Sequence, residues 1–330
     1  MSVTPRIIEY YLARSASKGL KPILFAFLSI LSATSASGQR LNADTLEPAA
    51  VLSGSTATQE HCKTLPDAVW VTVEKQGDCI RYYDYGLLGE NAIALIVFHG
   101  DILKRNRSAG EWTNHEMRAY RDNNPIILRA RMQGIWQQFG VPSIFFARPG
   151  TYGSSGDHKV RRSRREVAVV NAALDEIKRT HNIKLLSIAG QSGGGHMVGA
   201  LLSLRDDIRC AVIASGVVSV RQRMQIKGWS SDATGLRQFF DPIDHVLKIR
   251  KVEGMRIFIV GDPKDTNVPF TTQERFYMAL KTRGLDAHLL KVLAVGPERH
   301  GLDHVLPRLG SSCAKDVASD VIRAMYSPAE

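Results

Sequence analysis

A serine between closely spaced glycines is the strongest chemical signal in the sequence. Residues 190–194 read Gly-Gln-Ser-Gly-Gly, a G-x-S-x-G pattern with Ser192 at its centre. An apolar run at 185–189 precedes the pattern, and a run of helical length through Leu204 follows it. A chain that turns from a strand into a helix within a few residues strains the backbone of the serine and exposes its hydroxyl at the positive helix end. The pattern therefore predicts Ser192 as a nucleophile in acyl transfer.

An acid is needed to orient the base that activates such a serine, and it should follow the serine in the chain, before the base. The apolar run 257–260 leads into two acids, Asp262 and Asp265. Asp262 stands directly before a proline and is typical of a turn. Asp265 lies farther out on the loop, where a carboxylate can reach a histidine. We therefore favour Asp265 and keep Asp262 as the alternative.

The base should be a histidine on the loop after the last strand. The predicted last strand, residues 288–295, is followed by His300, with His304 four residues further on. Gly301 directly after His300 allows the backbone to approach the site closely. We therefore favour His300.

Two backbone N–H groups are also needed to stabilise the negative charge that develops on the substrate carbonyl oxygen. One is expected from Gly193, the residue after the nucleophile. The other is expected from the loop that begins His99-Gly100, with Asp101 as the donor and Ile102 as the alternative. The carboxylate of Asp101 must then point away from the oxyanion. His99 is expected to anchor this loop.

Alternating strands and helices are needed to bring these residues together. A hairpin is predicted from 69–73 and 79–85, and a helix from 125–139, which Gly140 ends. Continuous apolar runs predict strands buried on both faces of a parallel sheet, at 92–98, 143–147, 185–189, 211–214 and 257–260. The pattern indicates one α/β domain over residues 67–330. A short insertion at about 221–250 is expected to form a lid, whose Trp229, Phe239 and Phe240 either shape a pocket or pack on the domain.

The N-terminal region has the three parts of a secretory signal peptide. Basic residues precede an apolar run at 22–31, which is too short to cross a bilayer, and small residues follow at 32–38. We expect residues 1–38 to be this signal and 39–66 to be an extended leader. The mature chain is then periplasmic or secreted, with no stable membrane span.

Four cysteines are compatible with disulfides in an exported chain, and none has the spacing of a zinc site. Of the three ways to pair them, Cys62–Cys79 with Cys210–Cys313 is the least entangled in sequence. Cys210 lies in an apolar run, so a buried free thiol is an equal alternative for the second pair.

The formal net charge is +11. Residues 1–38 hold four basic residues and one acid, which leaves +8 on the rest. The densest basic run, Lys159 with Arg161, Arg162, Arg164 and Arg165, has no interleaved aromatic residues. It is therefore interpreted as a solvated face, and we expect no nucleic-acid partner, metal or cofactor.

Together these segments resemble the α/β-hydrolase superfamily, and more narrowly the hydrolase domain of prolyl-oligopeptidase-like and dienelactone-hydrolase-like proteins. The resemblance covers about residues 92–305 and is carried by His99-Gly100, Arg148-Pro149-Gly150, Gly153-Ser154-Ser155-Gly156, the Ser192 pattern, Asp241-Pro242-Ile243-Asp244, Asp265-Thr266-Asn267-Val268-Pro269 with Gln273, Ala279-Leu280-Lys281 with Gly284, and His300-Gly301.

The resemblance implies the α/β-hydrolase fold and a metal-independent hydrolase that acts through an acyl-enzyme on Ser192. Carboxylic esters are the expected substrates, and peptides and lactones are the alternatives. Two features depart from the peptidases of this group: no N-terminal propeller is expected, and Gln191 precedes the serine. A binding protein that has kept the fold without its chemistry is the hypothesis from another class.

Overall fold

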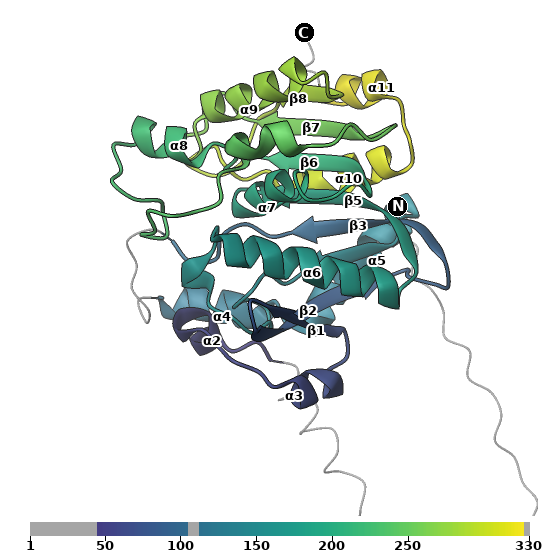
Figure 1. Ribbon diagram of the computed structural model, residues 1–330, viewed down its shortest axis with the longest axis vertical. Coiled ribbons are helices and arrows are strands. Elements are labelled where there is room, and N and C mark those ends of the chain that lie inside the picture. Colours follow the sequence, from purple (N-terminus) through teal and green to yellow (C-terminus); the bar gives the residue numbers. More distant parts are fainter. Residues whose placement is uncertain (1–44, 105–111, 327–330) are drawn as a thin grey trace, which may run out of the picture. The chain divides into compact units, whose positions relative to one another are not determined.

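The structure is a computed structural model that describes residues 45–104 and 112–326 (Figure 1). The predicted signal peptide, residues 1–38, lies outside the described residues, as does the leader as far as residue 44. None of the helices in the described ranges has the length and apolar character needed to cross a membrane.

Within the described residues, eight strands form one sheet in the order β1-β2-β4-β3-β5-β6-β7-β8. The antiparallel part consists of β1 (Ala68–Val73) and β2 (Gln76–Tyr85), which form the predicted hairpin, and β2 also pairs antiparallel with β4. The parallel part consists of β4 (Ser143–Phe146), β3 (Asn91–Phe98), β5 (Ile183–Gln191), β6 (Ile208–Ala214), β7 (Arg256–Gly261) and β8 (Ala287–Lys291). Because β3 and β5 to β8 are parallel, their carboxyl ends meet at one edge of the sheet.

The last strand is shorter than predicted. It ends at Lys291, opposite Gly261, where β7 also ends. Beyond this point Ala294 donates its N–H to the side chain of Asp262, and Val295 pairs with Gly301 to close the following loop. The apolar residues to 295 therefore belong to a loop that bends back over the site.

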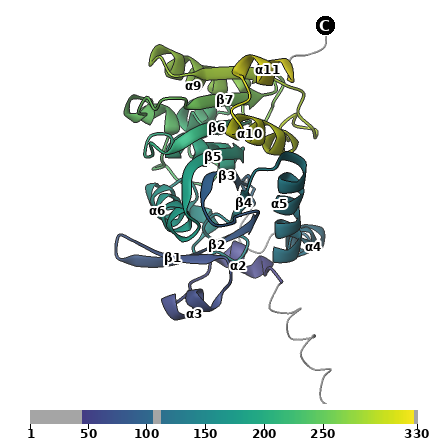
Figure 2. The ribbon, with the colours of Figure 1, turned by 90° about the vertical axis from the view of Figure 1, so that its right-hand side faces the viewer.

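Helices cover both faces of the sheet (Figure 2). The helices α6 (Arg164–Thr180), α7 (Gly193–Leu201) and α9 (Phe270–Thr282) bury their apolar residues in one core. The helices α4 (Asn114–Asp122), α5 (Pro125–Phe139), α10 (Leu306–Ala314) and α11 (Ser319–Ala324) contribute to the core on the other face. The predicted fold class, a mostly parallel sheet flanked by helices, is confirmed.

Local sequence explains where the longer helices begin and end. The side chain of Asn124 caps α5, Pro125 occupies its first turn, and Gly140 ends it in a left-handed conformation with φ of 64°. The side chain of Ser163 caps α6 through the N–H of Glu166. The apolar stripe of α6 is fully buried against the sheet.

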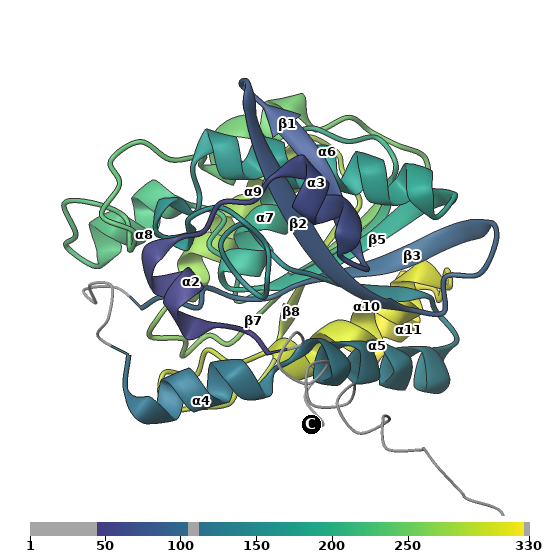
Figure 3. The same ribbon diagram turned by 90° about the horizontal axis from the view of Figure 1, so that it is seen from below.

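The leader differs from the extended chain that its composition predicted. It contains α2 (Pro48–Ser53), which buries Val51 and Leu52, and α3 (Gln59–Thr64), which lies against the hairpin of β1 and β2 (Figure 3). Contacts with the domain stabilise these two short helices, and such contacts cannot be read from a polar, aperiodic sequence.

The Cys62–Cys79 disulfide is present as predicted, and for Cys210 the structure has the disulfide with Cys313 rather than the equally weighted free thiol. Cys62 of α3 is bonded to Cys79 of β2, and Cys210 of β6 is bonded to Cys313 of α10. The first bond ties the leader to the hairpin, and the second ties α10 to the sheet.

The predicted lid consists of α8 (Val220–Ile226), an irregular segment, and η2 (Pro242–Lys248), a short 3-10 helix. Two of its aromatic residues pack on the domain: Phe239 contacts Val217 and Val220, and Phe240 belongs to the core that contains α6. Asp241 accepts hydrogen bonds from the N–H groups of Val220 and Arg221 and so fixes the first turn of α8.

Candidate active site

Ser192 occupies a tight turn between β5, which ends at Gln191, and α7, which begins at Gly193. Its φ of 55° and ψ of −114° are strained for a residue with a side chain. Two backbone hydrogen bonds hold this conformation: the Ser192 N–H donates to Ala214 at 2.9 Å, and the Val217 N–H donates to the Ser192 carbonyl at 3.2 Å. The strain that the sequence predicted is therefore present and supported by neighbouring backbone.

The glycines on either side of the serine are required by space. A Cβ atom on Gly190 would lie 2.4 Å from the carbonyl carbon of Gly194. A Cβ atom on Gly194 would lie 2.3 Å from the carbonyl oxygen of Phe98. Each distance is far below van der Waals contact, so only glycine allows α7 to start so close to β3 and β5.

Asp265 and His300 are brought together from the loops after β7 and β8. Oδ2 of Asp265 lies 2.8 Å from Nδ1 of His300. Oδ1 of Asp265 accepts the N–H groups of Asn267 at 2.8 Å and Val268 at 2.9 Å, so the carboxylate is held in place on both sides. Gln191, next to the serine, donates its side-chain N–H to the carbonyl of His300 at 3.0 Å.

The rival acid and the rival histidine lie elsewhere. Oδ1 of Asp262 accepts the N–H of Lys264 at 2.8 Å, and Oδ2 pairs with Arg299. His304 is exposed in η3 (Asp303–Val305), and it makes no hydrogen bond to any residue that the structure describes. Among the described residues, neither Asp262 nor His304 takes part in an acid–histidine pair, whereas Asp265 and His300 form one.

Of the two N–H groups considered for the second oxyanion donor, one is already engaged. The Ile102 N–H donates to Nε2 of His158 at 3.2 Å. In the described part of the chain, the N–H groups of Asp101 and Gly193 donate to no protein acceptor. The oxyanion role of Gly193 and Asp101 stays a prediction. Ile102 is not available for this role, because its N–H already donates to His158.

The Asp101 carboxylate is neutralised by three arginines. Its Oδ1 lies 3.0 Å from Nη1 of Arg148, its Oδ2 lies 3.1 Å from Nε of Arg161, and Oδ2 also pairs with Arg162. Burial alone would raise the pKa of Asp101, but the charges of Arg162, Arg161 and Arg148 hold it well below its ordinary value. The carboxylate is therefore turned toward the arginines and compensated there.

Two more acids complete what we name the buried ion cluster. Nη2 of Arg148 lies 2.8 Å from Oε1 of Glu166, and Nε of Arg162 lies 2.8 Å from Oδ2 of Asp232. The cluster thus pairs three arginines with three carboxylates: Arg148, Arg161 and Arg162 with Asp101, Glu166 and Asp232.

The interpretation of the basic run as a solvated face is wrong for its central residues. Arg161 and Arg162 are buried in the ion cluster, and Arg165 pairs with Asp78 at 2.6 Å. Lys159 and Arg164 do face solvent. The carboxylates that Arg161 and Arg162 meet lie about 60 to 70 residues away in the chain, at Asp101 and Asp232.

His99 anchors its loop, as expected. Its Nδ1 hydrogen-bonds the Gly100 carbonyl at 2.6 Å, and its Nε2 accepts the N–H of Arg148 at 3.3 Å. Burial, with the neighbouring charge of Arg148, lowers the pKa of His99 to about 3, so the ring is neutral. It therefore fixes the loop that carries Asp101.

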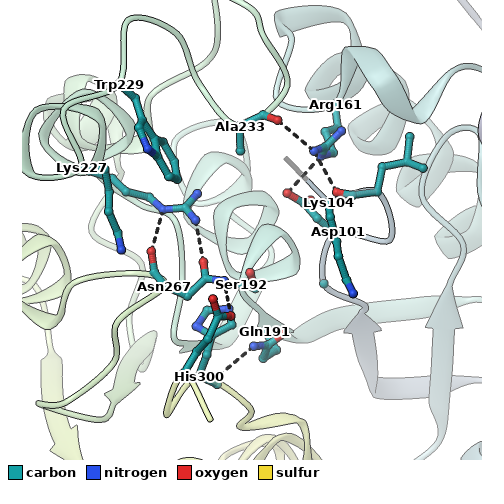
Figure 4. A pocket seen from close by; sticks show the side chains of 14 residues that line it. Asp101, Lys104, Arg161, Gln191, Ser192, Lys227, Trp229, Ala233, Asn267 and His300 are labelled. Carbon is teal, nitrogen blue, oxygen red and sulfur yellow. Dashed lines mark hydrogen bonds and ion pairs between the residues drawn. The ribbon is translucent and has the colours of Figure 1, made fainter. Parts of the chain in front are cut away.

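Ser192 and His300 line one pocket of about 420 Å³. Figure 4 shows Trp229 and Lys227 on one side of it, Asp101 and Arg161 on the other, and Ser192 between them. The remaining lining residues are Gly100, Leu103, Lys104, Gln191, Arg223, Ala233, Asn267 and Glu298. Of the three lid aromatics, Trp229 is the one that reaches this pocket.

Two basic lining residues, Arg223 and Lys227, were not singled out from the sequence. Arg223 of α8 donates through Nε to the Asn267 carbonyl at 3.1 Å and through Nη2 to its Oδ1 at 2.6 Å. Lys227 donates to the carbonyl of Thr266. The lid is irregular in sequence, and no local pattern indicated which of its side chains turn inward.

We find no group of three or more His, Cys, Asp or Glu side chains that could hold a metal ion within residues 45–104 and 112–326. The groups around Ser192 are of the kinds that acyl transfer requires: a hydroxyl, a histidine paired with a carboxylate, and backbone N–H groups.

A comparison with protein families matches the region of the chain that holds the candidate site. Residues 156–305 match the model of the prolyl oligopeptidase family, a region that contains Ser192, Asp265 and His300. No curated protein sequence matches the chain.

Solved structures of two esterases and of a peptidase are similar to this chain. The esterase Pf2001 from Pyrococcus furiosus has 16% identity and a TM-score of 0.50, over 79% of this chain and 93% of the esterase. Est1E from Butyrivibrio proteoclasticus has 16% identity and a TM-score of 0.48, over 75% of this chain and 97% of Est1E. The acylaminoacyl peptidase from Pyrococcus horikoshii has 15% identity and a TM-score of 0.48, over 77% of this chain but only 42% of the peptidase.

The chain has the α/β-hydrolase fold, and residues 156–305 are similar to the prolyl oligopeptidase family. It is a serine hydrolase of the esterase or peptidase kind.

Proposed function

We propose that this α/β-hydrolase is exported and hydrolyses carboxylic esters through an acyl-enzyme on Ser192, with His300 as base and Asp265 as its orienting acid. The single observation that carries the proposal is the 2.8 Å contact between Asp265 Oδ2 and His300 Nδ1 beside a strained Ser192 in one pocket. These are the roles that nucleophilic catalysis by serine requires.

The reaction follows from these roles. The Ser192 oxygen forms a bond to the ester carbonyl carbon while its proton passes to Nε2 of His300. The carbonyl π electrons move onto oxygen, and they return as the C–O bond to the alcohol breaks and the alcohol leaves with the proton from His300. Water then attacks the acyl-enzyme by the same route, which releases the acid and restores the serine. Asp265 stabilises the imidazolium in each half-reaction.

The N–H groups of Gly193 and Asp101 would stabilise the oxyanion in both steps. A free carboxylate beside them would oppose this. The ion pairs of Asp101 with Arg148, Arg161 and Arg162 support the assignment, because they compensate the carboxylate and leave its backbone N–H available.

Esters are preferred over peptides for two reasons. An alcohol leaves more easily than an amine, so an ester demands less of the proton transfer from His300. A pocket of about 420 Å³ suits a small molecule rather than an extended peptide. A peptidase of the prolyl oligopeptidase type and a lactone hydrolase remain the alternatives.

Labelling by a fluorophosphonate tests the chemistry, since only an activated serine reacts well with it. The wild-type protein should become labelled, and Ser192→Ala should not. Parallel assays with p-nitrophenyl butyrate and with a matched p-nitroanilide peptide should give the higher kcat/KM for the ester. An unlabelled wild type would favour a binding protein on a hydrolase fold.

Export is supported by the tripartite pattern of residues 1–38 and by the two disulfides, which persist in oxidising compartments. The N-terminus of protein recovered from its native cells should lie at about residues 36–40. Recovery of the chain with Met1 intact from the cytoplasm would contradict export without touching the hydrolase assignment.

A further inference from the structure

Arg223 is a buried cation in the active-site pocket without a carboxylate partner. Its side chain lines the pocket while the residue as a whole is only 6% exposed. The three arginines of the buried ion cluster each contact a carboxylate. Arg223 contacts none among the residues that the structure describes, and its hydrogen bonds go to the backbone and side chain of Asn267.

An arginine in this position is costly unless something compensates its charge. Burial and the charge of Arg162 lower the pKa of Arg223 to about 10, so the guanidinium is still protonated at neutral pH. Desolvating a charge without an ion partner costs free energy. Nε and Nη2 donate to Asn267, whereas Nη1 donates to no described group. One end of the guanidinium is therefore available to a ligand in the pocket.

The neighbouring side chains hold Arg223 in place and add positive charge. Its guanidinium carbon lies 5.0 Å from the centre of the Trp229 ring, a cation–π contact that fixes its direction. Lys227, one helical turn further on, also lines the pocket, and it forms no ion pair in the described part of the chain.

Acidic residues lie near Arg223 but do not pair with it: the charges of Asp232, Asp101 and Asp265 partly offset the effect of burial on its pKa without an ion-pair contact. Asp101 is already neutralised by the ion cluster. Glu298 lies at the exposed rim of the pocket, where its Oε2 accepts the Nδ2 group of Asn267 at 2.8 Å. The Asn267 amide thus separates Glu298 from Arg223. The wall formed by α8 and the turn after it remains cationic.

We propose that Arg223, aided by Lys227, binds a free carboxylate on the substrate, so that the preferred substrates are carboxylic esters with a second, anionic carboxylate. The inference rests on the proposed function and narrows its substrate class. The carboxylate can belong to the acid part of the ester or to its alcohol part, and the experiment distinguishes the two.

Two pairs of matched substrates test the inference. In the first pair the charge is on the acid part: p-nitrophenyl hydrogen glutarate against p-nitrophenyl valerate. In the second it is on the leaving group: 4-acetoxybenzoate against its methyl ester. Wild type should prefer the anionic member of one pair by about tenfold or more in kcat/KM, the range for a charged hydrogen bond. The pair that shows the preference identifies the part of the ester that carries the carboxylate.

Variants at position 223 test which residue is responsible. Arg223→Met keeps the apolar volume and should remove most of the preference, whereas Arg223→Lys should retain part of it. The control is Arg221→Gln on the same helix, which removes a largely exposed side chain that pairs with Asp244 outside the pocket. It should leave the preference unchanged.

A binding measurement separates this inference from the proposed catalysis. Ser192→Ala protein should bind monomethyl glutarate more tightly than dimethyl glutarate, and the double variant with Arg223→Met should lose the difference.

If wild type is labelled by fluorophosphonate and hydrolyses neutral esters as well as anionic ones, the carboxylate site is wrong and the hydrolase stands. If labelling fails while the anion still binds through Arg223, the catalytic proposal is wrong and the site stands. An equal loss for both substrates in Arg223→Lys would assign Arg223 a structural role and overturn the inference.

Discussion

Asp262 and Arg299 form an ion pair that joins the two loops of the active site, with 2.6 Å between Oδ2 and Nη2. The same carboxylate accepts the N–H of Ala294 at 2.8 Å. Asp262 therefore fixes the loop that carries His300, while Asp265 faces the histidine itself. Asp262 thus holds the backbone of the His300 loop, and Asp265, three residues on, holds the imidazole of His300.

Substitution of these two acids should have different consequences. Asp265→Asn should lower kcat by about a thousandfold or more, because an amide can hold the imidazole in the wrong tautomer. Asp262→Asn should mainly lower the melting temperature, since it weakens the contact with Arg299, and kcat of the folded protein should change far less. Steady-state kinetics and thermal melts on both variants measure the difference. A dead but stable Asp262→Asn would reverse the assignment.

The two histidines should differ in the same way. His300→Ala should lower kcat by about a thousandfold or more, because no other base is available to take the Ser192 proton. His304→Ala is the matched control, since His304 is exposed and makes no hydrogen bond to the described residues. Its turnover should stay close to wild type. Near-normal turnover of His300→Ala would remove this residue from the mechanism.

Gly193 should not tolerate even one methyl group. A Cβ atom there would lie 1.9 Å from Oδ1 of Asp101 and 2.8 Å from Nη1 of Arg148. Gly193→Ala should therefore push the Asp101 loop away from Ser192 and reduce fluorophosphonate labelling by at least about tenfold. Gly134→Ala in α5 is the control, because nothing lies within 4 Å of its added Cβ. It should keep full labelling and gain up to about 1 kcal/mol of stability. Equal labelling of Gly193→Ala and Gly134→Ala would mean that the Asp101 loop moves aside without a loss of Ser192 reactivity.

Local patterns were sufficient for the strands other than the end of β8, for the Ser192 turn and for the loops of Asp265 and His300. A buried strand, a glycine-bounded turn and the order of strands along the chain are each encoded by neighbouring residues. The carboxyl ends of parallel strands then meet at one sheet edge, so positions far apart in sequence could be brought together by topology alone.

Long-range charge compensation could not be predicted in this way. Arg161 and Arg162 stand in the same basic run as Lys159 and Arg164, which are exposed. Burial of an arginine is decided by carboxylates from distant parts of the chain, here those of Asp101 and Asp232. Arg223 was missed for a related reason: its direction depends on Asn267 and Trp229, which contact it only after the lid has folded.

The buried ion cluster should make stability depend on pH below about 4. Burial raises the pKa of Asp101 and of Asp232, but the charge of Arg162 outweighs it, and both pKa values lie below their ordinary value of about 4. Depressed carboxyl pKa values stabilise the fold above the unfolded pKa, and this contribution is lost as the pH falls toward the folded values. Wild type should therefore be clearly less stable to urea at pH 3 than at pH 7.

Substitution of Arg162 measures how much the charge of the buried ion cluster contributes to the unfolding free energy. Arg162→Met leaves Asp232 buried without its ion-pair partner and should cost about 3–5 kcal/mol of unfolding free energy at pH 7. The difference in unfolding free energy between Arg162→Met and wild type should be smaller at pH 3, because protonation of Asp232 removes the uncompensated charge. Arg164→Met, two residues on and exposed, is the control and should change stability by less than about 0.5 kcal/mol at either pH. Urea unfolding with the disulfides intact measures all four differences. A gap for Arg162→Met that stays constant between pH 7 and pH 3 would assign the loss to packing, and the Asp101 loop would then be held in place by shape rather than by charge.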